Sequence, residues 1–147
     1  MKNAALFAVL LVVLGCASGT QSSAKTPPID IRLEQVNTTP DMYYFAGPVN
    51  IQYQLSITNS TNETYRLRRL DLRTISSGAY SLRTPASSMN VTIPPGKTVT
   101  VNLSAWGRSR GGNLHTEEPV TIQGTAHFEG PNGNFVKIFQ QMLSQRG

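Results

Sequence analysis

Hydrophobic and polar residues alternate with a period of two along most of the chain after residue 28. The clearest segment has an apolar residue at every second position from Val49 to Ile57, which is typical of a strand with one wet face. The same pattern predicts further strands at residues 29–34, 65–73, 89–93, 98–105 and 120–128, with a short extended piece at 79–83. Turn-forming sequences separate these segments. We therefore expect an all-β fold, an antiparallel immunoglobulin- or fibronectin-like sandwich of about seven strands.

Three local signals refine this prediction. The alternation changes phase between Leu67 and Leu70, as it does at a β-bulge. Pro94-Pro95-Gly96 predicts a type II turn. Asn132-Gly133 favours a hairpin, although the apolar residues after it also match helical spacing. We expect residues 135–143 to be a strand that pairs back across the hairpin, and a helical turn at its end stays open.

The first residues carry a different pattern. A single charged residue, Lys2, precedes an apolar run that ends at Leu14 and is shorter than the roughly 20 residues of a membrane-spanning helix. The run closes on Val13-Leu14-Gly15-Cys16, which resembles the lipobox of bacterial lipoproteins. The resemblance implies a signal peptide at residues 1–15, cleavage before Cys16, and acylation of that cysteine by chains such as palmitate. The alternative is an ordinary cleaved signal peptide that leaves Cys16 unmodified.

Residues 16–28 are small and polar and end in Pro27-Pro28, so they predict a flexible tether between the anchor and a single domain at residues 29–147. In the lipoproteins that this segment resembles, Ala17 after the cysteine favours the outer membrane under the sorting rule of enteric bacteria. We therefore expect a lipid-anchored protein of the bacterial cell envelope, on the periplasmic face or the cell surface.

Composition narrows the choice of partners. The formal net charge is +5, and only 14% of the residues are charged, which is unlike the dense basic face of a nucleic-acid-binding protein. We expect no nucleic acid as partner, and an envelope protein or an anionic polymer instead. Because Cys16 is the only cysteine, the domain has no disulfide.

Two groups of residues are candidates for binding. Arg66, Arg68, Arg69 and Arg73 fall near one another. They form either an anion-binding patch or, as we prefer, a solvated charged sheet face. The second group is Trp106, Arg108 and Arg110. We interpret Trp106 as an aromatic that caps the end of the core rather than an exposed contact residue. Residues 107–118 lack periodicity and predict a flexible loop, in which glycines beside arginines are an alternative anion site.

No motif for catalysis stands out. The only histidines are His115 and His127, and His115 with Glu117 and Glu118 lacks the spacing of known zinc sites. The sequence contains neither a phosphate-binding glycine loop nor a nucleophile elbow. We therefore expect no catalytic residue, no metal and no cofactor, and a protein that is not an enzyme.

Several segments resemble the water-stress and hypersensitive-response (WHy) or LEA-14-like family of sandwiches. These segments are Gln54 to Glu63, Leu70-Asp71-Leu72, Ile93 to Lys97, and the hairpin from Gly124 to Phe135. The resemblance implies a non-catalytic stabilising or binding module. We rank three functions: an envelope lipoprotein with a protein- or polymer-binding surface, a stress-protective module of WHy type, and a hydrolase or metal protein built around His115.

Overall fold

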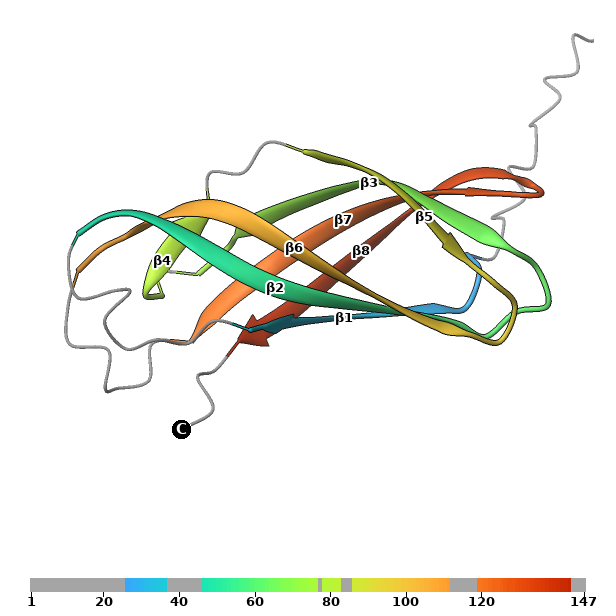
Figure 1. Ribbon diagram of the computed structural model, residues 1–147, viewed down its shortest axis with the longest axis horizontal. Helices are drawn as coiled ribbons and strands as arrows, with labels where there is room; N and C mark the ends of the chain where they lie inside the picture. Colours follow the sequence, from blue (N-terminus) through green and yellow to red (C-terminus); the bar gives the residue numbers. More distant parts are fainter. Residues whose placement is uncertain (1–25, 37–45, 77, 83–85, 112–118, 144–147) are drawn as a thin grey trace, which may run out of the picture.

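The chain forms two four-stranded antiparallel sheets that pack face to face (Figure 1). The computed structural model describes residues 26–36, 46–76, 78–82, 86–111 and 119–143. One sheet has the strand order β1-β2-β6-β4 and the other has the order β5-β3-β7-β8. The strands are β1 (Ile29–Gln35), β2 (Gly47–Asn59), β3 (Tyr65–Thr74), β4 (Tyr80–Leu82), β5 (Ser87–Ile93), β6 (Thr98–Ser109), β7 (Val120–Gly130) and β8 (Gly133–Leu143). The predicted all-β sandwich is confirmed, with eight strands.

The chain crosses between the sheets at every connection from β2 to β7, whereas β1–β2 and β7–β8 are neighbours in one sheet. The β5–β6 crossing uses the predicted turn: the Lys97 N–H donates to the Pro94 carbonyl at 3.3 Å, and Gly96 has a φ of 63°. That positive φ at the third position is what a type II turn requires. The central strands follow the immunoglobulin order, with β1-β2-β6 facing β3-β7-β8.

The core consists of the inward-facing apolar residues of both sheets. Its largest fully buried side chains are those of Tyr53, Tyr80 and Phe128. The two phenols share a hydrogen bond of 2.8 Å, and Tyr80 donates to the Gln35 side-chain oxygen at 2.9 Å. Burial therefore stabilises the fold without leaving these hydroxyls unsatisfied.

The β-bulge is where the alternation predicts it. The register of β3 shifts between Leu67 and Arg69 against both β5 and β7. Leu67 and Leu70 are both buried, because the extra residue returns the apolar side chains to the core after the phase change. As a consequence, Arg68 and Arg69 both lie exposed on the outer face.

The C-terminal segment is a strand, as predicted. β8 pairs with β7 in a continuous register from Gly130↔Gly133 to Val120↔Leu143. The central residues of the turn are Pro131 and Asn132, one position before the Asn-Gly pair that signals the hairpin. The strand continues to Leu143, so residues 135–143 do not end in the helical turn that the sequence left open. Residues 144–147 lie outside the described residues.

The aperiodic segment proposed at residues 107–118 starts too early, because β6 continues to Ser109. Gly107 and Ser109 occupy the inward positions of the strand, so its period of two has no apolar residue to mark it. A side chain at position 107 would meet the Ser81 carbonyl oxygen at 2.8 Å, because β4 pairs closely there. Residues 112–118 lie outside the described part of the chain.

The two ends of the sandwich carry different connections (Figure 1). The end where β1 begins also holds the β2–β3 connection, the Pro94 turn and the β7–β8 hairpin. The start of β2, the end of β6 and β4 lie together at the opposite end. The chain thus enters the domain at the hairpin end, and β1 runs from there toward the opposite end. The predicted signal peptide and the predicted tether up to residue 25 lie outside the described residues.

Candidate functional site

The four arginines predicted to gather do so on the outer face of β3. Arg66, Arg68, Arg69 and Arg73 are all exposed. Two of them pair with carboxylates: Arg68 with Glu129 at 3.5 Å and Arg69 with Asp71 at 3.0 Å. Arg73 donates to the Gln123 side-chain oxygen at 2.6 Å. The sheet therefore neutralises half of the cluster itself, which favours the solvated charged face over a dedicated anion site.

His127 belongs to the same network. Its Nε2 lies 3.3 Å from the Asp71 carboxylate, which also pairs with Arg69. His127 lies directly opposite Arg69 in the β3–β7 register. Over the residues that the structure describes, no three His, Cys, Asp or Glu side chains converge on a point that would hold a metal ion. His127 thus joins two strands by a cross-strand contact. His115, Glu117 and Glu118 lie outside the described residues.

A row of apolar side chains lies on the outer face of β8, beside this network. Val136, Ile138 and Met142 are 47%, 62% and 64% exposed. They project outward because Phe135, Lys137 and Phe139 take the inward positions of the same strand. Sequence reasoning missed this row. The signal that reveals it is the apolar residues on both phases of residues 135–143, which a strand with one wet face lacks.

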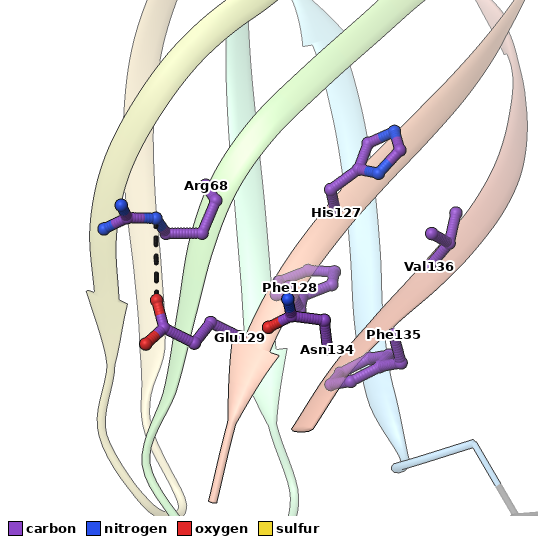
Figure 2. Close-up of a pocket in the computed structure, with 7 residues that line it drawn as sticks. All are labelled: Arg68, His127, Phe128, Glu129, Asn134, Phe135 and Val136. Atoms are coloured by element: carbon purple, nitrogen blue, oxygen red, sulfur yellow. Dashed lines mark ion pairs between the residues drawn. The ribbon is translucent and has the colours of Figure 1, made fainter. Parts of the chain in front are cut away.

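Between β3 and β8 the outer face is hollowed by a depression of about 430 Å³. Figure 2 shows the Arg68–Glu129 ion pair on one side of it and His127 and Val136 on the other. Phe128 and Phe135, whose rings stack on the core side of the sheet with centroids 5.1 Å apart, also belong to its lining. The depression therefore joins the charged strand to the apolar row in one surface, which we call the β8 face and define as the outward residues of β3, β7 and β8.

The outer face of the other sheet is chemically different. Hydroxyl and amide side chains of β2 and β6 bond across the strands, at 2.8 Å for Thr58 and Thr98 and 3.4 Å for Gln54 and Asn102. Trp106 lies near the far end of β6 and is 62% exposed, so its interpretation as a core cap is wrong. The alternation of β6 does not twist out of phase there: Ala105 and Gly107 are the buried neighbours.

The candidate binding residues therefore divide between two faces. Arg108 is exposed on the same strand as Trp106, and Arg110 is exposed just after it, whereas the four other arginines lie on the opposite sheet. The predicted lipobox residues Val13, Leu14, Gly15 and Cys16 lie outside the described part of the chain. In the described residues, no helix is long and apolar enough to cross a membrane.

No protein-family model matches the chain, and no curated protein matches it in sequence. Solved structures are similar in fold. A protein from Archaeoglobus fulgidus has a TM-score of 0.49 and 11% identity, over 77% of this chain and 91% of that chain. The yeast GGA1 GAE domain has a TM-score of 0.48 and 14% identity, over 79% and 91% of the two chains. A FixG-related protein from Vibrio parahaemolyticus has a TM-score of 0.42 and 15% identity, over 81% and 97%. At these values the likeness says nothing of function.

Proposed function

We propose that this protein is a non-catalytic binding module of the bacterial cell envelope, anchored by lipid on Cys16, and that the β8 face binds a partner protein. The observation that carries the proposal is the apolar row of Val136, Ile138 and Met142, exposed beside a charged network. Val136 and Ile138 are outward neighbours on β8, and Met142 follows beyond Gln140. Exposed apolar side chains gathered on one face beside a polar rim are typical of an interaction surface.

The chemistry of the two faces supports this choice. The outer face of β2 and β6 satisfies its polar side chains by pairing them with one another, as between Thr58 and Thr98. The β8 face combines apolar residues with arginines, the combination enriched at protein interfaces. A partner that covers Ile138 and its neighbours would remove their apolar surface from water, at roughly 25 cal/mol per Å².

The geometry of the anchor is compatible with this use. A tether of residues 16–28 has a root-mean-square reach of about 20 Å. It enters the domain at the hairpin end, and β8 then runs for 11 residues, or about 37 Å, away from that end. A flexible tether of this length leaves the β8 face accessible to a partner in the same compartment.

The anchor is tested by labelling cells with radioactive palmitate. We expect label on the wild-type protein and none on Cys16→Ser. An unlabelled wild-type protein would contradict the lipoprotein part of the proposal.

The binding surface is tested by crosslinking in intact cells followed by pull-down. We expect a partner with the wild type, loss of that partner with Ile138→Asp, and its retention with the matched control Asn102→Asp. Both substitutions add a charge at an exposed strand position, on opposite faces of the sandwich. A partner captured equally by the three proteins, or lost in the control alone, contradicts the assignment of the β8 face. Cys16→Ser shows whether capture depends on the anchor.

A further inference from the structure

We propose that the open edge of β8 binds an extended, acidic segment of the partner protein as an added β-strand. This inference rests on the proposed function and names the chemistry of the partner. It starts from the position of β8 as the last strand of its sheet, with no strand beyond it in the part of the chain that the structure describes.

The register shows which backbone groups face that edge. Gly130 and Gly133 flank a two-residue turn, so they form a hydrogen-bonded pair, and such pairs alternate along an antiparallel ladder. The odd-numbered residues of β8 therefore bond to β7. The N–H and C=O groups of Val136, Ile138 and Gln140 point to the open edge, where an added strand would pair with them.

The other sheet edges have features that discourage such pairing, and β8 has few of them. β4 is three residues long, and β1 carries Asp30, Arg32 and Glu34 at alternate positions. β5, the other edge of the same sheet, is uncharged, but it has only seven residues and its register is broken at the β3 bulge. β8 has 11 residues, no proline, a continuous register with β7 and a single charge, Lys137. Natural proteins protect long edges of this kind, and Lys137 is the one protecting charge on β8, so the edge is suited to an added strand that brings a matching carboxylate.

The positive charge at and near the β8 edge favours an acidic partner segment. Lys137 points inward at the seam between the sheets, where its ammonium donates to the Ile29 carbonyl of β1. A strand added at β8 would lie against that seam, and a carboxylate there would meet the Lys137 charge. On the described residues of the outer face, the four arginines of β3 exceed the two carboxylates Asp71 and Glu129, which attracts an acidic segment to this sheet at longer range. The direct contact at the β8 edge is with Lys137, whereas a second copy of this chain brings the same cations.

The two faces of β8 determine which side chains an added strand would carry at alternate positions. Residues of an added strand that face outward would lie beside Val136 and Ile138, which favours apolar side chains. Residues that face inward would lie beside Lys137, which favours carboxylates. The expected partner segment thus alternates apolar and acidic residues.

The test uses the full-length protein in detergent and synthetic peptides as long as β8. The probe alternates Glu and Val, and the control alternates Lys and Val. We expect the Glu-Val peptide to slow hydrogen exchange at the amides of Val136, Ile138 and Gln140 by about tenfold or more. Lys-Val should leave these amides unchanged. Lys137→Gln should reduce the preference for the acidic peptide.

Two further probes separate strand addition from contact with the face alone. Gln140→Pro removes an edge donor without breaking the β7–β8 ladder and should abolish protection. If that variant does not fold, a Glu-Val peptide methylated on alternate backbone nitrogens serves instead, and it should not bind. Equal effects of the Glu-Val and Lys-Val peptides, protection of other strands only, or binding of the methylated peptide would each overturn the inference.

Protection of the three amides that grows with protein concentration in the absence of peptide would assign the edge to a second copy of the chain, and this too overturns it. The proposed function fails separately: the crosslinked partner would be unaffected by Ile138→Asp even where the Glu-Val peptide protects the edge.

Discussion

Replacing Asn59 should destabilise the domain more than its place in a polar turn sequence indicates. The residue ends β2 and is fully buried. Its Nδ2 donates to the carbonyl oxygens of Glu63, Ile93 and Pro94 at 2.7, 3.2 and 3.1 Å. Its Oδ1 accepts from the N–H and the hydroxyl of Thr61 at 3.0 and 2.8 Å. One side chain thus joins the β2–β3 turn to the β5–β6 turn of the opposite crossing.

The magnitude follows from counting these bonds. Because Nδ2 carries two hydrogens, the side chain makes two donated and two accepted bonds at one time, each worth about 1 kcal/mol net. Asn59→Ala should therefore lower the free energy of unfolding by about 4 kcal/mol, a large part of the roughly 5–15 kcal/mol typical of a domain. Asn59→Asp keeps the shape but removes both donors, so it should cost at least as much.

Urea denaturation followed by tryptophan fluorescence or circular dichroism measures this change. With a slope of about 2 kcal/mol/M, we expect the midpoint of Asn59→Ala to fall by about 2 M urea. The matched control is Asn62→Ala, because Asn62 is exposed in the same turn. If the two variants unfold within about 0.5 kcal/mol of each other, Asn59 does not hold the two turns together.

Three other substitutions test separate parts of the structure. Gly124→Ala should cost about 1–3 kcal/mol in urea denaturation, because the ring of Phe139 occupies the space of the added methyl group. Trp106→Ser should change the free energy of unfolding by less than about 0.5 kcal/mol, because the side chain is exposed. A larger loss would show that this side chain packs against the core. Burial raises the pKa of the Tyr65 phenol above 10.0, and its hydrogen bond to Glu63 raises it further. Stability from this phenol is therefore present below about pH 10 and lost as pH rises through the folded-state pKa. In thermal melts, Tyr65→Phe should lose less stability than the wild type as the pH rises above about 10, and an identical loss would contradict the effect.

The sandwich was predictable where the inward residues are large and apolar. The alternation in β2 and the phase change at Arg68 and Arg69 each follow from the geometry of a strand, in which a one-residue insertion moves every later side chain to the other face. The end of β6 was not predictable in this way. Gly107 and Ser109 fill the inward positions there because β4 leaves no room, and small residues carry no periodic signal.

The site was only partly predictable. The arginines of β3 lie together because they share one strand, and this follows from sequence alone. The pairing of Arg69 with Asp71 is also local, because the two residues lie two positions apart on β3. The pairing of Arg68 with Glu129 depends on the pairing and register of β3 and β7. The apolar row of β8 escaped detection for another reason. Phe135, Val136, Ile138 and Phe139 fit a helix as well as a strand with apolar residues on both faces.

The most direct test of the account is a scan with a photocrosslinking amino acid along β8 in intact cells, with Asn102 of the other sheet as the control position. We expect adducts with a partner protein at alternate positions, from Val136, Ile138 and Met142, and none from Asn102. Adducts confined to Asn102, adducts from every position alike, or a β8 that yields none would contradict it.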